Sequence, residues 1–184
     1  NGRGLNPFPQ VQDLNTDCGN FLVQVNRTIR LICELPGFFY SLERPDSNFE
    51  HLSRRLSAAI DGDSPILKFL NINAEAVRYL IDLRNFHEHP KEIRTIIENF
   101  KVLPNGNFQV PVWYLADGKP AEPCPIMEDM IASVHFLTEL TETMLIHLVM
   151  QRINSNFPFV LPETPEEELN PAIPIKYRLG LGKK

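Results

Sequence analysis

The chain is poor in cysteine, and its cysteines do not have the spacing of a redox or zinc motif. Cys18, Cys33 and Cys124 are the three that it contains. An odd number without a C-x-x-C pair argues against a disulfide framework and against a zinc knuckle. Cys18 and Cys33 lie among apolar residues, so both are predicted to be buried thiols.

Long apolar runs and an excess of basic residues are also missing. No stretch approaches the roughly 18–20 apolar residues that span a bilayer, and no signal-peptide pattern stands near the start. We therefore expect a cytoplasmic protein that does not contact a membrane. The formal net charge of −5 argues against a protein that coats nucleic acids, because such proteins are usually basic. It leaves room for a small, locally basic site.

The common phosphate-binding and nucleophile motifs are absent as well. The sequence has no P-loop, no G-x-G-x-x-G and no G-x-S-x-G pattern. It also has no convergent Cys or Asp cluster with metal-ligand spacing. We expect neither a cofactor nor a metal.

What is present is a series of amphipathic helices. With 184 residues, 43% of them hydrophobic, the chain is long enough for one domain with a substantial core. Apolar residues recur at spacings of three and four from Leu14 to Ile32, which predicts a first helix ending at Pro36-Gly37. The capping-box pattern Ser47-Asn48-Phe49-Glu50 predicts a second helix that runs to Ile60.

Two more helical regions follow. The third is expected in two pieces, a short helix from Pro65 to Leu70 and a helix that Asn73 caps and that runs to about His89. The last long helix is predicted at about 126–153. Its apolar stripe consists of Met127, Met130, Ile131, Val134, Leu137, Met144, Leu145, Leu148 and Val149.

Between these helices, residues at about 95–122 have the pattern of a β-hairpin insertion. The turn Pro104-Asn105-Gly106-Asn107 separates two apolar, partly β-branched segments, and Pro111 predicts that the second arm is an edge strand. Residues 91–98 are equally compatible with a helical turn. The elements together predict an all-α bundle of four to five helices over residues 1–153. A proline-rich, extended arm is expected at 154–184 and is a candidate for binding a protein partner.

The candidate chemistry lies in Arg84-Asn85-Phe86-His87-Glu88-His89-Pro90, at the end of the third helical region. Helical spacing from Val77 places Arg84 on the buried face, with Asn85 beside it and His89 one turn further on the same side. Phe86 and His87 point elsewhere. A buried guanidinium costs several kcal/mol unless it is paired, so the position of Arg84 asks for a reason.

These side chains suit phosphoryl-transfer chemistry without a metal. Histidine exchanges a proton near neutral pH, and the forked donors of arginine stabilise an oxyanion or phosphorane. Together they fit RNA cleavage in which the ribose 2′-hydroxyl attacks the adjacent phosphate.

Two structural or metal-binding interpretations compete with this one. Arginine and histidine near a helix C-terminus favour the macrodipole, and Arg84 could pair with an acid on a neighbouring helix. His87 and His89 could bind a metal, although H-x-H on a helix separates the two rings by about 200°.

The sequence Arg84-Asn85-(three residues)-His89 resembles the R-N-x-x-x-H signature of HEPN-domain proteins. Those proteins are compact all-α bundles, often homodimers, and many are metal-independent endoribonucleases in toxin–antitoxin, phage-defence and RNA-processing systems. The resemblance implies that Arg84 stabilises the transition state and His89 moves the proton. It implies that Asn85 orients the phosphate or holds the motif, and that two copies of the motif meet across a dimer.

The function expected on this resemblance is therefore that of a HEPN-like endoribonuclease acting as a homodimer on RNA. The alternative is a non-catalytic, homodimeric helical interaction protein, in which the same residues form a buried polar network at the dimer seam. The acidic net charge and the long apolar stripes motivate that alternative.

Overall fold

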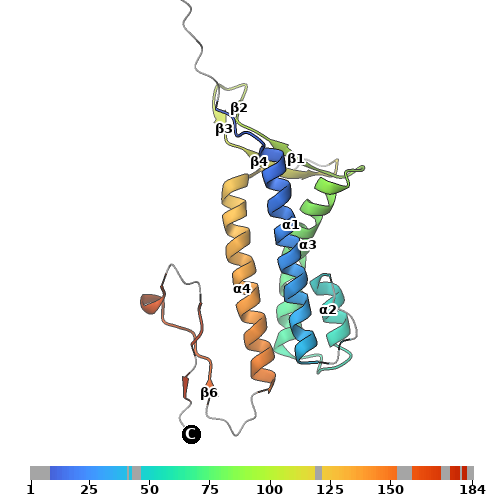
Figure 1. The fold of residues 1–184 in the computed structure, drawn as a ribbon, viewed down its shortest axis with the longest axis vertical. Helices are drawn as coiled ribbons and strands as arrows, with labels where there is room; N and C mark the ends of the chain where they lie inside the picture. The colour runs from blue at the N-terminus through green and yellow to red at the C-terminus, as the bar shows by residue number, and fades with distance from the viewer. Residues whose placement is uncertain are drawn as a thin grey trace, which may run out of the picture. The chain divides into compact units, whose positions relative to one another are not determined.

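The computed structural model describes residues 9–40, 42, 47–118, 122–152, 159–170, 175–178 and 180–181. Within these ranges the four α helices are α1 (Leu14–Glu34), α2 (Phe49–Leu56), α3 (Pro65–Glu88) and α4 (Ile126–Arg152). The short 3-10 helices are η1 (Leu35–Phe38) and η2 (Glu166–Glu168). The strands are β1 (Arg94–Glu98), β2 (Lys101–Val102), β3 (Phe108–Gln109), β4 (Val112–Ala116), β5 (Cys124–Pro125), β6 (Phe159–Val160) and β7 (Gly180–Leu181) (Figure 1).

The prediction of an all-α fold is wrong, because the chain is a mixed α/β protein. Strands β1, β4 and β5 form a three-stranded antiparallel sheet, and β2 pairs with β3. Val112 and Trp113 on β4 are 4% and 0% exposed. The sheet therefore contributes to the core and is not a surface insertion on a helical bundle.

The predicted hairpin itself is present, and residues 94–98 are a strand and not a helical turn. Its two ladders pair Ile97 with Trp113 and Lys101 with Gln109. Gly106 closes the turn with a φ of 84° and donates its N–H to the Leu103 carbonyl at 2.9 Å. Glycine adopts this left-handed conformation without the steric cost that a β-carbon brings.

The expected edge position of the second arm is wrong, because β4 lies between β1 and β5. Pro111 stands in the gap between β3 and β4, where the ladder needs no donor from it. Its carbonyl accepts the N–H of Ile126 at 3.0 Å. The proline therefore connects the sheet to the start of α4.

Two compact units make up the chain. The first consists of Asn1–Asn26 and Leu80–Ala132, and the second of Arg27–Tyr79 and Ser133–Lys184. This division does not follow the predicted boundary at residue 153. A helical domain at 1–153 with an arm at 154–184 stays a prediction.

In the first unit the sheet packs on parts of three helices (Figure 1). The Trp113 ring lies 6.1 Å from that of Phe21 on α1, and its Nε1 donates to Asp129 Oδ2 on α4 at 2.6 Å. Thr95 on β1 donates its hydroxyl to the carbonyl of Leu83 on α3 at 2.7 Å. The Thr95 bond thus holds the end of α3 against the sheet, and the two Trp113 contacts hold α1 and α4.

The second unit contains α2 and most of the remaining helical residues. Asn48, and not the predicted Ser47, caps α2, since its Oδ1 accepts the N–H of His51 at 2.9 Å. The Phe69 ring lies 6.1 Å from that of Phe49 and 5.4 Å from that of His147. Part of the C-terminal arm contacts α4 here, because Glu142 Oε1 accepts the N–H of Tyr177 at 3.0 Å.

The expected break in the third helical region is absent, and α3 runs without interruption from Pro65 to Glu88. The Asn73 side chain donates to the Phe69 carbonyl at 2.9 Å, in the preceding turn, and so caps no new helix. Cys18 and Cys33 are buried as predicted, at 0% and 1% exposed. Across the described helices, none is both long and apolar enough to cross a bilayer.

The predicted bounds of the last helix are close to those of α4, but its predicted stripe is only partly buried. Leu137, Met144 and Leu148 are in the core, together with Leu140, which was not assigned to the stripe. The exposed members of the predicted stripe are Met127, Ile131, Val134, Leu145 and Val149. The spacing of apolar residues alone therefore predicted a wider buried face of α4 than the structure has.

Candidate functional site at the end of α3

The end of α3 is held firmly before the chain turns away. Leu80 and Leu83 are 4% and 0% exposed, so this part of the helix packs into the core of the first unit. The N–H of His89 donates to the Asn85 carbonyl at 2.8 Å and completes the last turn. Pro90 follows and disfavours further helix. The motif residues therefore stand on a rigid element and not on a loop.

Arg84 is half-buried, with 23% of its side chain exposed. Its Nη1 donates to Asn85 Oδ1 at 3.1 Å, and its Nη2 forms an ion pair with Glu88 Oε2. Its Nε is buried and has no hydrogen-bond partner among the described residues. The acid that balances Arg84 is thus on its own helix, four residues further on, and not on a neighbouring helix.

His89 is far more accessible, with 72% of its side chain exposed. Its Nε2 lies 3.9 Å from Glu88 Oε2. The Arg84 and Asn85 side chains are hydrogen-bonded to each other, and the backbone hydrogen bond from His89 N–H to the Asn85 carbonyl connects Asn85 to His89. The Glu88 carboxylate is thus paired with Arg84 and lies near the His89 ring, beyond hydrogen-bond distance.

His87 lies on a different side of the helix, in agreement with the predicted direction. Its Nε2 is 3.4 Å from Asn15 Oδ1 on α1. A β-carbon added at Gly19 would lie 2.7 Å from His87 Cε1, so the glycine allows the ring to pack against α1. This ring is a packing contact between two helices.

Metal binding by His87 and His89 gains no support from this arrangement, since the two rings contact different neighbours. In the part of the chain that the structure describes, no three His, Cys, Asp or Glu side chains gather as they would around a metal ion.

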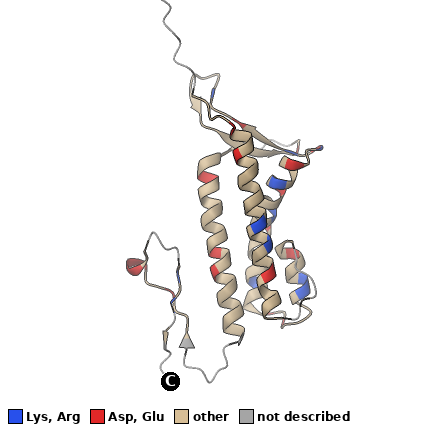
Figure 2. Ribbon diagram, viewed as in Figure 1, with Lys and Arg blue, Asp and Glu red and all other residues tan. Residues whose placement is uncertain are grey.

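The charge around the motif differs from that of α4. Lys91 and Arg94 are exposed and follow the motif directly. By contrast, α4 carries Glu128, Asp129, Glu139 and Glu142 and no Lys or Arg before Arg152 (Figure 2). At the end of α3 the exposed cations Lys91 and Arg94 are the groups that can attract an anionic ligand, with the acids Glu88 and Glu92 beside them in the sequence.

Glu88 is the residue of this site that had no predicted role. The signal was present, since an acid four residues from Arg84 on one helix face is placed to form an ion pair. The contacts of His87 with Asn15 and Gly19 carried no such signal, because they join segments far apart in the sequence.

The arrangement combines three chemical capacities at one helix end. Arg84 can donate hydrogen bonds from its cationic group to an oxyanion. His89 is exposed to solvent and can accept or donate a proton. An incoming anion can replace the Glu88 carboxylate as the partner of Arg84.

No protein-family model, curated protein or solved structure matches this chain.

Proposed function

We propose that this protein is a metal-independent endoribonuclease that cleaves RNA by attack of the ribose 2′-hydroxyl on the adjacent phosphate. The proposal rests on one observation: at the accessible end of α3, the Glu88 carboxylate that is paired with Arg84 lies 3.9 Å from His89 Nε2. The resemblance of this segment to the HEPN signature supports the same chemistry.

The reaction assigns one task to each residue. Neutral His89 accepts the proton of the 2′-hydroxyl, the new O2′–P bond forms, and the P–O5′ bond breaks. The 5′ oxygen takes up a proton, so the products are a 2′,3′-cyclic phosphate and a 5′-hydroxyl. Arg84 stabilises the added negative charge on the phosphorane. Asn85 orients the guanidinium, and the phosphate takes the place of the Glu88 carboxylate.

This reaction needs both a base and an acid, and each motif offers a single exposed imidazole, because His87 packs against α1. We propose that a homodimer supplies the second His89. The protein would act on RNA in the cytoplasm, in a toxin–antitoxin or defence system, and its C-terminal arm would bind a protein partner.

The test is cleavage of single-stranded RNA by the purified full chain in the presence of EDTA. Cleavage is expected to persist with the chelator, and His89→Ala should lower the rate by roughly 10²–10⁴-fold. His135→Ala is the matched control, since it removes an exposed imidazole of α4. Products without a 2′,3′-cyclic phosphate, or full activity of His89→Ala, would reject this mechanism.

A second candidate function is a non-catalytic, homodimeric interaction protein with a polar network. The observation that favours it is that Arg84 is only 23% exposed and is already paired with Glu88. Here Arg84→Ala should lower the melting temperature or dissociate the dimer, with no RNA cleavage to lose. An unchanged melting temperature together with an unchanged oligomeric state in this variant would exclude it.

A further inference from the structure

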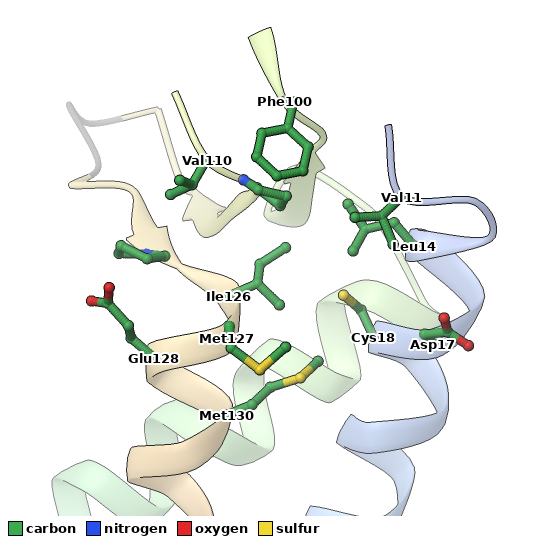
Figure 3. Close-up of a pocket in the computed structure, with 12 residues that line it drawn as sticks. Val11, Leu14, Asp17, Cys18, Phe100, Val110, Ile126, Met127, Glu128 and Met130 are labelled. Atoms are coloured by element: carbon green, nitrogen blue, oxygen red, sulfur yellow. The ribbon is translucent and has the colours of Figure 1, made fainter. Parts of the chain in front are cut away.

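An apolar pocket of about 370 Å³ lies in the first unit. This volume is within the range of about 300–1,000 Å³ that is typical of small-molecule sites. The side chains labelled around it in Figure 3 are Val11, Leu14, Asp17, Cys18, Phe100, Val110, Ile126, Met127, Glu128 and Met130. They come from the segment before α1, from α1, from the hairpin and from the start of α4.

Hydrogen bonds hold the mouth of this pocket in place. Asn99 Oδ1 accepts the N–H of Val11 at 3.1 Å and that of Phe100 at 2.9 Å. Asn99 Nδ2 donates to the Val11 carbonyl at 2.8 Å. The Ile126 N–H bond to Pro111 fixes the opposite side at 3.0 Å. One amide side chain thus joins two walls that are far apart in the sequence.

The interior is suited to a flexible or flat apolar group. Met127 and Met130 have unbranched thioether side chains that adapt to the shape of a ligand (Figure 3). Burial raises the pKa of the Cys18 thiol to about 11, so at neutral pH this side chain is an uncharged wall and not a nucleophile.

Among the described residues, the charged side chains that line the pocket are both acidic. Asp17 and Glu128 stand at its two ends in Figure 3, and no described Lys or Arg lines it. Neither carboxylate forms an ion pair with another described residue. An apolar site with two unbalanced carboxylates favours a ligand that is apolar and carries positive charge.

We propose that this pocket binds a small amine with an apolar alkyl or aryl body. The body fills the space between Phe100, Ile126 and the methionines, and the ammonium group lies by one of the two carboxylates, at one end of the pocket. This site is separate in its residues from Arg84 and His89, and it does not depend on the proposed ribonuclease activity.

The experiment compares octylammonium, octanol and octanoate by isothermal titration calorimetry with the full chain. These probes share one alkyl chain and differ in head-group charge. We expect saturable binding of octylammonium at one site, weaker binding of octanol, and the weakest binding of octanoate. The preference for octylammonium over octanol should be roughly fivefold, as for one exposed charge pair.

Two sets of variants locate the site and its charge. Val110→Phe should fill the mouth and lower the affinity for octylammonium at least tenfold, whereas Val102→Phe, at an exposed position of β2, should not. Replacing Asp17 and Glu128 together by Asn and Gln should remove the preference for octylammonium and leave octanol binding intact. The fluorescence of buried Trp113 serves as the check on folding.

Three results would each overturn the proposal. Octanoate binding as tightly as octylammonium would refute the preference of the pocket for an amine. Octylammonium binding that survives in a correctly folded Val110→Phe variant would place the ligand elsewhere. No saturable binding of any probe would refute the pocket as a ligand site.

Discussion

At the scale of single residues, the carboxylate of Glu88 determines what Arg84 can do. It forms the ion pair with Arg84 Nη2 and lies 3.9 Å from His89 Nε2. Both side chains of the ion pair are less than one-third exposed, at 23% and 29%, so solvent screens the pair only partly. In the proposed ribonuclease, RNA phosphate and Glu88 compete for the same guanidinium.

Glu88→Gln should therefore strengthen RNA binding. The substitution keeps the size of the side chain and removes a competing charge interaction of about 0.5–1 kcal/mol, which corresponds to a roughly two- to fivefold lower dissociation constant. The measurement is binding of a single-stranded 2′-deoxy oligonucleotide, which cannot be cleaved.

The control for this prediction is Glu92→Gln, which changes the net charge equally at an exposed position of the following loop. Weaker binding by Glu88→Gln would mean that the carboxylate organises the site and does not compete for it. An equal gain in affinity in both variants would mean that the change in net charge alone strengthens binding.

His147 gives the second unit a dependence on pH. Burial lowers the pKa of its ring from the ordinary value of 6.5, and the ring packs 5.4 Å from that of Phe69. Below pH 6.5 the unfolded chain takes up the proton more readily than the folded one. The free energy of unfolding is therefore greatest above that pH and falls as the pH drops towards the lowered pKa.

His147→Gln should reduce this loss of stability in acid, because it removes the titrating ring. The measurement is urea unfolding at about pH 7.5 and about pH 5.5, on either side of the ordinary histidine pKa. His135→Gln, at an exposed position of the same helix, should leave the difference between the two pH values unchanged. An equal fall in stability in wild type and His147→Gln would assign the pH dependence to other groups.

At the scale of elements, the sequence correctly predicted the features that depend on local patterns. The bounds of α1 and α4 and the turn around Gly106 follow from apolar periodicity and from residues that end helices. The break expected at Asn73 failed because an asparagine side chain can either cap a helix or bond to the preceding turn, and spacing does not decide between them. The central place of β4 depends on pairing with β5 (Cys124–Pro125), two residues that have no strand pattern in the sequence.

The site was predictable to a similar extent. The half-buried position of Arg84 followed from helical spacing, because Arg84 continues the face of Leu80. The pocket was not predictable, since it joins segments that individually resemble core or linker. Only the fold brings Asn99 to Val11 and so creates a cavity there.

One contact between elements should be costly to remove. Trp113 is fully buried, and its Nε1 donates to Asp129 Oδ2 at 2.6 Å, which joins β4 to α4. Asp129→Ala should leave this donor without a partner and lower the free energy of unfolding by about 1–3 kcal/mol. Urea unfolding followed by the fluorescence of the only tryptophan measures it.

Asp129→Asn is the matched variant, since it keeps an acceptor and removes the charge. It should lose only the favourable interaction of an acid with the start of a helix, about 0.3–1 kcal/mol. If Asn and Ala cost the same, the charge and not the hydrogen bond stabilises this junction.

At the scale of the whole molecule, the net charge of −5 restricts where RNA can bind. Two acids of α4, Glu128 and Asp129, lie in the same unit as the site. There Arg84, Lys91 and Arg94 follow one another closely at the end of α3 and after it. Binding that uses these three cations releases few counterions. RNA affinity should then fall only gently with salt, in contrast to that of a basic coating protein.

The logarithm of the binding constant for a single-stranded 2′-deoxy oligonucleotide should fall against the logarithm of salt concentration with a slope of roughly −2 per chain, from three contacts at about −0.7 each. Arg84→Gln and Lys91→Gln should each make this slope shallower by about 0.7. Lys101→Gln is the control, because it removes the same charge from β2, outside the three cations at the end of α3 and after it. If Arg84→Gln lowered affinity without changing the slope, Arg84 would support the fold of the site and would not contact phosphate.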